Sequence, residues 1–250
     1  MAISIKSDRE IELMKEAGRI LAITHEELEK ALHPGMTTYD IDKLGEEIIR
    51  SYGCIPSFLH YHGYPASICV SVNDEVVHGI PSKKHFIKEG DIVSLDAGVI
   101  YKGYHSDAAR THAIGQISSE AEKLIRVTKE CFFEGIKAVK EGAHIADISR
   151  AVQTHAESNG FSVVRDLVGH GVGSNLHEDP QIPNFVDKKR GPRLQAGMTL
   201  AIEPMINAGA YAVRWLDDDW TVVTEDGSLS AHYENTVLVT KDGCELLSIQ

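Results

Sequence analysis

Two aspartates lie within a stretch that otherwise predicts a pair of strands. GDIVSLDAGVIYKGYHSDAARTHAI covers residues 90–114 and carries Asp96 and Asp107 on either side of a predicted turn. Asp96 follows Val93 and Leu95, so it occupies a position where a buried strand should be apolar. Aspartate is disfavoured in strands, and burying its charge is costly unless a partner compensates it. The two positions therefore require a chemical explanation.

An internal repeat brings further carboxylates into the predicted strands. At an offset of 107 residues, Asp96 is matched to Glu203. Farther along the chain the offset grows to 127, and Asp107 is then matched to Glu234. Each half thus contributes two carboxylates from two neighbouring strands. A pseudo-twofold arrangement of the halves is expected to gather all four at its centre.

Divalent cations would stabilise such a cluster. Four carboxylates cannot be buried together unaided, because they repel one another and each loses its hydration. Hard oxygen ligands suit Mn(II), Fe(II), Co(II) or Zn(II). A single aspartate in a strand is more often a loop cap or a solvent-facing residue, but four at matched positions fit that interpretation poorly. The pattern therefore predicts a site for a pair of metal ions.

A histidine between glycines is the next candidate ligand. In LVGHGVGSNLHEDP, residues 167–180, His170 is flanked by glycines that let the backbone come close to a site. His177 follows just before Glu178. The stretch is neither the H-E-x-x-H motif of zinc peptidases nor a dinucleotide fingerprint. A lone histidine is more often a satisfied core or surface group, so His170 is a candidate because of the carboxylates predicted around it.

The elements that must position these residues follow from the same repeat. Segments 31–54 and 138–161 both predict a helix, a glycine turn and a second helix. The second helices end at Gly53 and Gly160, which suit the C′ position. The identity between the segments is low, and a chance match is the alternative.

No linker or low-complexity segment divides the chain. We therefore expect one catalytic domain over 1–250, with halves of about 1–115 and 116–250.

Composition excludes several classes of protein. The 250 residues are 42% hydrophobic and 25% charged, as in an ordinary globular protein, and the formal net charge is -12. Sequence-specific nucleic-acid binding normally needs a basic face, and the short basic run at 187–193 reads as a solvated loop. No apolar run approaches the roughly 20 residues that cross a bilayer, and the N-terminus has no signal pattern. Four widely spaced cysteines favour reduced thiols, and we expect a cytoplasmic protein.

Six motifs carry a resemblance to a known family. They are YHGYPASICVSVNDEVVHGIP (61–81), GDIVSLDAGVIYKGYHSD (90–107), GHGVG (169–173), LHEDP (176–180), IEPM (202–205) and YENTV (233–237). Through them nearly the whole chain resembles the type I methionine aminopeptidases. The resemblance implies the pita-bread fold, an α/β (α+β) arrangement of two pseudo-twofold halves with a curved antiparallel sheet covered by helices.

The resemblance also implies a dinuclear site and its chemistry. Its ligands are Asp96, Asp107, His170, Glu203 and Glu234, and the metals are two ions of Co²⁺, Mn²⁺, Fe²⁺ or Zn²⁺. Asp107 and Glu234 are expected to bridge the ions. Glu203 is the best candidate to accept a proton from the attacking water. The argument from repeated carboxylates reaches four of these five ligands independently.

Further residues of this resemblance concern the substrate. His78 is expected near the scissile amide and His177 near the carbonyl oxygen, although either could be an ordinary surface histidine. The methionine pocket is expected to be formed by Phe58, Tyr61, Tyr64, Cys69, His78, His177 and Trp220, although its aromatic members could equally be core residues.

The implied reaction is removal of the N-terminal methionine from nascent polypeptides with a small second residue. In a bacterium it follows deformylation, near the ribosome exit. Nothing in the sequence requires more than a monomer, and no membrane partner is expected.

Departures from the family pattern concern residues beside the implied site. His232 stands where glutamine is usual, Asn235 where histidine is common, and Leu176 where some relatives have a phenylalanine in the pocket. Metal affinity and pocket width are therefore less well defined by the sequence than the chemistry.

Two other activities fit parts of the pattern. An X-Pro-cleaving prolidase or aminopeptidase P would share the five ligands, but such enzymes typically carry a large additional N-terminal domain. A non-catalytic binding protein of the same fold would usually have lost ligands, and all five are present. A purely structural metal protein would have no use for His78 and His177.

Overall fold

The computed structural model describes residues 3–249 and contains four α-helices within that range. The first half contains α1 (Asp8–Ala31), α2 (Thr38–Ser51), β1 (Ile55–Pro56), the 3-10 turn η1 (Tyr61–Gly63), β2 (Ile68–Val72), β3 (Glu75–Val77), β4 (Ile92–Tyr101) and β5 (Tyr104–Ala113). The second half contains α3 (Ser119–Ile136), α4 (Ile145–Ser158), β6 (Ser162–Val163), β7 (Gly169–Gly171), β8 (Glu178–Ile182), β9 (Thr199–Ile202), β10 (Met205–Asn207), β11 (Val213–Trp215), β12 (Val222–Thr224), β13 (Ser230–His232), β14 (Asn235–Val239) and β15 (Cys244–Leu246).

The second helix of each half ends where the sequence predicts, and α2 begins with a capping box. Thr37 caps α2, and its side chain accepts a hydrogen bond from the backbone N–H of Asp40. The Asp40 carboxylate in turn accepts a hydrogen bond from the backbone N–H of Thr37, which completes a capping box. At the other end, Gly53 and Gly160 follow α2 and α4 with φ of 71° and 84°, a backbone conformation that favours glycine.

The predicted pair of strands around the two aspartates is the β4–β5 hairpin. Its antiparallel register places Asp96 opposite Ala109 and Asp107 opposite Gly98. The aspartates are therefore diagonal neighbours on one face of the hairpin. Side chains alternate along a strand, so Leu95 contributes to the hydrophobic core on the opposite face, where α1 packs.

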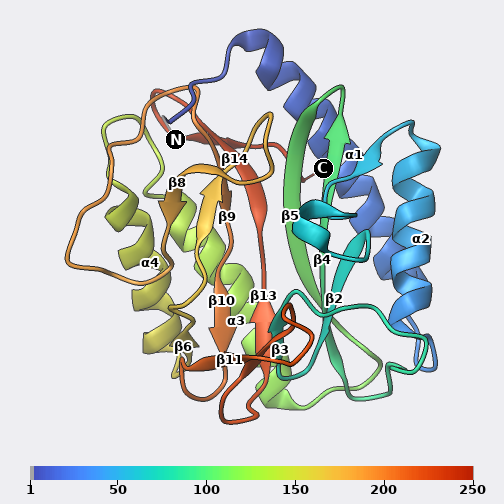
Figure 1. Ribbon diagram of the computed structural model, residues 1–250. Helices are drawn as coiled ribbons and strands as arrows, with labels where there is room; N and C mark the ends of the chain where they lie inside the picture. Colours follow the sequence, from blue (N-terminus) through green and yellow to red (C-terminus); the bar gives the residue numbers. More distant parts are fainter. Residues whose placement is uncertain (1–2, 250) are drawn as a thin grey trace.

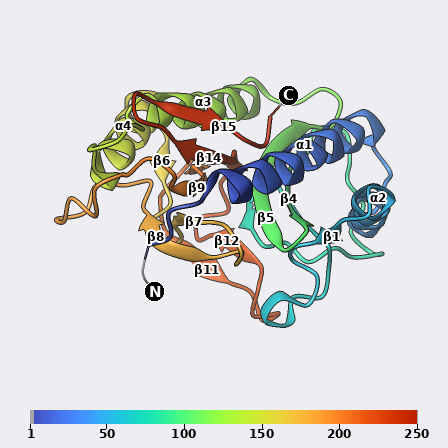
Figure 2. The ribbon, with the colours of Figure 1, turned by 90° about the horizontal axis from the view of Figure 1, so that it is seen from above.

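Antiparallel strands form four sheets between the helix pairs. Their orders are β1-β4-β2 with β5 beside β4, β13-β10-β6, β11-β12-β3, and β15-β14-β9-β7-β8. Figure 1 shows α1 and α2 beside the strands of the first half and α3 and α4 beside those of the second. Figure 2 shows the same division from above. The expected α+β architecture is confirmed, although the expected curved sheet is interrupted into shorter sheets.

The two halves meet along β5 and the β13–β14 segment. Ala109 and Glu234 exchange backbone hydrogen bonds across this line. Two matching contacts flank this pair. On one side the Thr111 hydroxyl hydrogen-bonds to the backbone of His232, and on the other side the Thr236 hydroxyl hydrogen-bonds to the backbone of Asp107. This symmetry equates Glu234 with Ala109.

The match of Asp107 to Glu234 in the sequence repeat is therefore wrong by two residues. The irregular backbone between β13 and β14 shifts the alignment, and low identity could not correct it. The match of Asp96 to Glu203 agrees with the strand registers. Asp96 lies opposite Ala109, and Ile202 of β9 lies opposite Asn235 of β14. Glu203, the residue after Ile202, is therefore related to Glu234 as Asp96 is related to Ala109.

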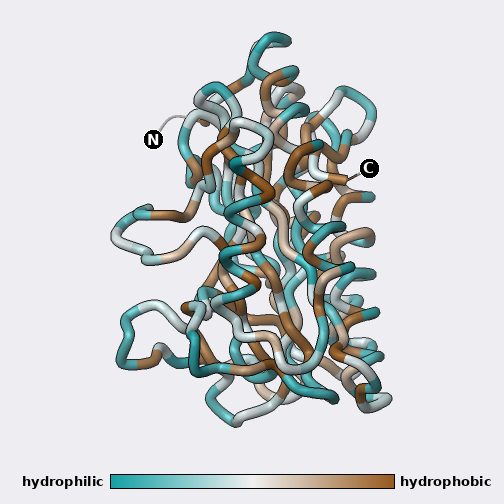
Figure 3. The backbone as a smooth tube through the Cα atoms, turned by 90° about the vertical axis from the view of Figure 1, so that its right-hand side faces the viewer, coloured by the Kyte–Doolittle hydropathy of each residue, from teal (hydrophilic) through white to brown (hydrophobic). Residues whose placement is uncertain are grey.

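Two large hydrophobic clusters fill the halves. One packs α1 and α2 on β2, β4 and β5, and the other packs α3 and α4 on the strands of the second half. Figure 3 shows hydrophilic residues at the outer turns of the helices and loops, with hydrophobic segments running between them. All four cysteines are free, and none of the helices in residues 3–249 is long and apolar enough to cross a membrane.

Candidate metal centre and substrate pocket

The five predicted ligands come from both halves of the chain. Asp96 and Asp107 project from β4 and β5, and His170 is the middle residue of β7. Glu203 and Glu234 lie in the gaps between β9 and β10 and between β13 and β14. Pro204 explains the first gap, because proline has no N–H to donate to a neighbouring strand. The local break frees both glutamates from regular strand geometry.

Three of the five side chains lie close enough to share one ion. Ligand atoms of Asp107, His170 and Glu234 all lie within 4.8 Å of one another. His170 Nε2 is 3.8 Å from Asp107 Oδ2 and 3.6 Å from Glu203 Oε1. Asp96 lies beside Asp107 on the hairpin, as the register requires. The structure thus brings the five candidates together.

Three carboxylate oxygens of this cluster lack a hydrogen-bond partner among the described residues. Asp96 Oδ1, Asp107 Oδ1 and Glu234 Oε1 are buried and accept no hydrogen bond from the described residues. Burial raises the pKa of Asp107 to about 7. For Asp96, Glu203 and Glu234, burial and the neighbouring carboxylates raise the pKa well above its usual range. Buried polar atoms are normally paired, so these oxygens point to a cation.

His170 presents a lone pair to the same cluster. Its Nδ1 lies 2.8 Å from the carbonyl oxygen of Gly171, which can only accept, so Nδ1 carries the hydrogen. Burial, assisted by His177, lowers the pKa of His170 to about 3, which keeps the ring neutral. Nε2 is then free to bind a metal. A neutral imidazole among buried carboxylates fits a divalent transition metal such as Mn(II), Fe(II), Co(II) or Zn(II).

A cavity of about 150 Å³ opens onto the cluster. It is lined by all five ligand candidates and by all the residues predicted for substrate, which are Phe58, Tyr61, Tyr64, Cys69, His78, His177 and Trp220. Leu176 also lines it, at the position where some relatives are expected to have phenylalanine. His62 is the wall residue that the sequence reasoning missed. The sequence signal that could have identified His62 is its position in YHGY, directly after the predicted pocket residue Tyr61.

One wall of the cavity is shaped by a close approach of two strands. Gly98 lies in β4 opposite Asp107, and a Cβ atom there would lie 2.6 Å from Ser57 Cβ and 3.0 Å from Phe58 Cε1. Only glycine leaves room for Phe58 at this distance. The opposite wall contains Trp220, whose ring meets that of Tyr64 edge-on at 5.1 Å between centroids.

Two further histidines, His78 and His177, line the cavity beside the ligand candidates. His177 Nδ1 shares a hydrogen bond of 3.0 Å with the Tyr61 hydroxyl, and its ring centroid lies 4.2 Å from that of His170. His78 follows β3 with φ of 60°, an unusual conformation for a residue other than glycine. Burial lowers the pKa of both rings, that of His78 to about 4. Both are therefore neutral at pH 7 and can donate one hydrogen each.

Comparison with known proteins agrees with this geometry. Metallopeptidase family M24 matches residues 12–241. A methionine aminopeptidase of Clostridium acetobutylicum is 56% identical over 247 residues, which cover 99% of each chain. The crystal structure of a methionine aminopeptidase from Thermotoga maritima superposes with a TM-score of 0.97 and 47% identity, over 99% of this chain and 100% of that one.

The chain belongs to the methionine aminopeptidases of metallopeptidase family M24. Membership of this metallopeptidase family implies a divalent metal. The pita-bread fold extends to peptidases of other specificity. An Xaa-Pro dipeptidase of Bacillus anthracis aligns with a TM-score of 0.81 at 26% identity, over 98% of this chain and 62% of that one. The shared fold does not distinguish the two activities, but the much higher identity to the methionine enzymes does.

Proposed function

We propose that this chain removes the N-terminal methionine from polypeptides, using two divalent ions held by Asp96, Asp107, His170, Glu203 and Glu234. The observation that carries the proposal is their convergence on one cavity with the predicted substrate residues. Buried carboxylate oxygens without hydrogen-bond partners support a cation at this site. Ions held by these residues would make a water molecule a better nucleophile near neutral pH, because they would lower its pKa.

Three side chains of this metallopeptidase provide proton acceptance and hydrogen-bond donation during the reaction. Glu203 borders both the ligand cluster and the cavity, so it accepts the proton of the attacking water. We assign the hydrogen of the Tyr61–His177 contact to the Tyr61 hydroxyl, which then donates to His177 Nδ1 and leaves the ring hydrogen on Nε2. His177 Nε2–H then donates to the carbonyl oxygen as negative charge develops there. His78 donates to the nitrogen side of the scissile bond.

The apolar wall of the cavity accounts for the selectivity for a methionine side chain. Phe58, Tyr64, Cys69 and Leu176 belong to one buried cluster beside the cavity, and the partly buried Trp220 packs against it. Burial of a methionine side chain there contributes roughly 1.5–3 kcal/mol. Contacts between its sulfur and the aromatic rings add a little more. The free α-amino group of the substrate would lie toward the acidic end of the same cavity, which restricts cleavage to the first peptide bond.

The proposal extends to the cellular setting. The substrates are nascent chains, deformylated first if the cell is bacterial, and the enzyme acts as a monomer in the cytoplasm close to the ribosome exit. The family membership supports the substrate class, and the net charge of -12 gives no support to sequence-specific nucleic-acid binding.

Release of methionine from a Met-Ala-Ser peptide tests the proposal. Metal-stripped protein is assayed with Mn(II), Fe(II), Co(II) or Zn(II) added back, beside Leu-Ala-Ser and Ala-Pro peptides and a Glu203→Ala control. We expect metal-dependent release from Met-Ala-Ser alone, abolished in the variant. Preferential cleavage of Ala-Pro would instead assign the enzyme to the X-Pro-specific branch. No cleavage of any peptide by protein that binds two ions would refute a catalytic role.

A further inference from the structure

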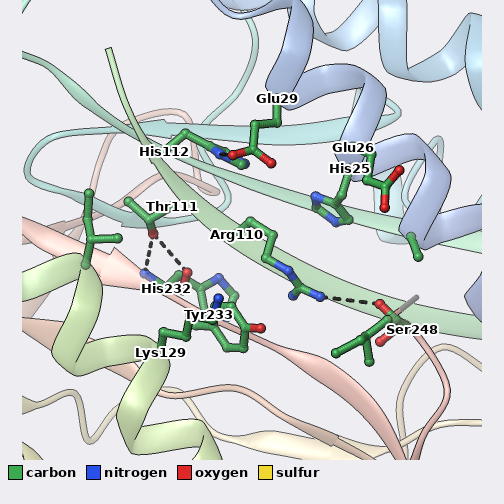
Figure 4. A pocket seen from close by; sticks show the side chains of 13 residues that line it. His25, Glu26, Glu29, Arg110, Thr111, His112, Lys129, His232, Tyr233 and Ser248 are labelled. Carbon is green, nitrogen blue, oxygen red and sulfur yellow. Dashed lines mark hydrogen bonds and ion pairs between the residues drawn. The ribbon is translucent and has the colours of Figure 1, made fainter. Parts of the chain in front are cut away.

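His232 occupies a buried position beside Glu203. It lies in β13 opposite Met205 of β10, and 1% of the residue is exposed. Its backbone is held from β5, because its N–H donates to Thr111 Oγ1 at 2.9 Å and the Thr111 hydroxyl donates to its carbonyl at 2.9 Å. Figure 4 shows both contacts at the edge of a second cavity. The direction of the ring is therefore fixed by two strands.

The ring of His232 has one polar neighbour within ion-pair distance in the described part of the chain. Neither ring nitrogen has a hydrogen-bond partner there, and Nε2 lies 3.7 Å from Glu203 Oε2. The other oxygen of the same carboxylate, Oε1, lies 3.6 Å from His170 Nε2. The carboxylate of Glu203 thus lies between two imidazoles, with one at each oxygen.

The chemistry of the two groups selects the donor. A neutral imidazole carries one hydrogen, on either Nδ1 or Nε2, and of these two atoms Nε2 is the one that lies within 3.7 Å of Glu203 Oε2. An ionised carboxylate only accepts hydrogen bonds. The hydrogen is therefore favoured on Nε2, toward Glu203. A separation of 3.7 Å exceeds a hydrogen bond, so the donation requires the two groups to approach more closely than they do here.

Two other histidines of the second cavity provide a contrast. His25 Nε2 lies 2.8 Å from the carbonyl oxygen of Ala108, and His112 Nδ1 lies 3.8 Å from Glu29. Figure 4 shows both on the side of α1, separated from His232 by Arg110 and Thr111. All three residues line the same cavity, and of the three only His232 approaches a candidate metal ligand.

We propose that His232 is a positioning residue whose Nε2–H donates to Glu203 Oε2 and fixes the Glu203 carboxylate for metal binding and proton acceptance. The inference rests on the proposed function, since that function gives Glu203 its role. Hydrogen bonds to a ligating carboxylate orient it, and their loss typically costs 10–100-fold in metal affinity or activity. His232 is also the position where this sequence departs from the glutamine expected in relatives. A glutamine amide could make the same donation.

Three variants test the role of His232. His232→Leu removes the donor, and His232→Gln keeps one. His112→Leu removes a largely buried imidazole that lines the same cavity but lies away from Glu203. Calorimetric titration of metal-free protein with Mn(II) gives the Kd, and kcat and KM are measured on Met-Ala-Ser. We expect His232→Leu to raise the Kd 10–100-fold and to lower kcat at least tenfold. His232→Gln should stay within threefold of the wild type, and His112→Leu should leave both constants unchanged.

A merely structural role predicts a different pattern. His232→Leu and His112→Leu would then lower the Tm alike, with an unchanged Kd for Mn(II). A Kd within twofold of the wild type in folded His232→Leu protein would refute the proposal, as would His232→Gln no better than His232→Leu. If wild-type protein releases no methionine with any metal, the proposed function fails, while the Kd series still decides the role of His232.

The tautomer of His232 gives a test that needs no folded leucine variant. Wild-type protein labelled with ¹⁵N-histidine is loaded with diamagnetic Zn(II), and the His232 signals are assigned by their loss in His232→Gln. The proposal requires the hydrogen on Nε2, with a resonance that shifts in Glu203→Gln protein. A hydrogen on Nδ1 would overturn it.

Discussion

His177 is the residue whose chemistry is easiest to separate from metal binding. It lines the cavity but is not among the three side chains whose ligand atoms lie within 4.8 Å of one another. We expect His177→Ala to lower kcat about 10²-fold, because a donor to the developing oxyanion is lost. The Kd for Mn(II) should not change. Steady-state kinetics and calorimetry check both expectations.

His105 supplies the matched control for His177. It is also a buried histidine, but its Nδ1 contacts Ser57 Oγ at 3.0 Å and its ring does not line the metal cavity. His105→Gln should retain kcat within a few-fold. Equal losses of kcat in the two variants would contradict a specific role for His177.

Asp107 should make metal-free protein sensitive to pH. Burial raises its pKa in the folded state to about 7, whereas an unfolded aspartate has a pKa of about 3.9. Between these values the folded state retains a proton that the unfolded state has lost, so the stability contributed by this carboxyl falls as pH rises. The slope is about 1.4 kcal/mol per pH unit.

Asp107→Asn removes that contribution, together with the charge that helps to raise the pKa of Asp96, Glu203 and Glu234. The free energy of unfolding of both proteins is measured by urea titration with a chelator present. The value for the variant minus that for the wild type should increase as pH rises from about 4.5 to about 6.5. The gain should level off above pH 7. The buried histidines titrate in both proteins and cancel in the difference. A difference independent of pH would show that Asp107 titrates normally.

At the scale of elements, the contact of β5 with β14 positions the ligands of both halves. Thr236 Oγ1 accepts from the N–H of Asp107 at 2.8 Å and donates to its carbonyl at 2.9 Å. Thr236→Val leaves these buried backbone groups without that partner. We expect a loss of about 1–3 kcal/mol in stability and weaker binding of Mn(II).

Thr128→Val is the corresponding control at this scale. Thr128 is also buried, but its hydroxyl donates to Leu124 O within α3, away from the metal cluster. Urea unfolding and calorimetry should show little change in Mn(II) affinity for this variant. If Thr236→Val binds Mn(II) as the wild type does, the contact between the halves does not position Asp107.

For the whole molecule, the metal should be part of the stability of the fold. The buried carboxylates repel one another in metal-free protein, and a cation bound only by the folded state stabilises it. Free Mn(II) at 100 times its Kd should add about 2.7 kcal/mol, which raises the Tm of a protein of this size by about 5–10 °C.

Thermal unfolding with and without Mn(II) measures this effect. Mg(II) serves as the comparison, because it dehydrates reluctantly and seldom uses a cage of protein ligands. Calorimetric stoichiometry in the same samples tests the prediction of two ions. An unchanged Tm at saturating Mn(II) would contradict a metal centre at the junction of the halves.

That the chain is one domain of two halves remains a prediction, which separate expression of 1–115 and 116–250 would examine.

The sequence by itself determined the elements and the chemistry. Apolar periodicity, glycines such as Gly53 and Gly160, and capping residues are local signals, so the helices and the β4–β5 hairpin could be predicted. Asp96 was informative because its polarity conflicts with a buried strand. The family motifs then led to the substrate residues that line the cavity.

Only the tertiary structure decided which residues meet. The pairing of Ala109 with Glu234 joins strands distant in sequence, and the repeat alignment missed it by two residues because a break between β13 and β14 leaves no local signal. The contact of His232 with Glu203 likewise depends on how β13 packs beside the end of β9. Distances between side chains arise from packing across the whole chain, whereas sequence patterns report on neighbours along it.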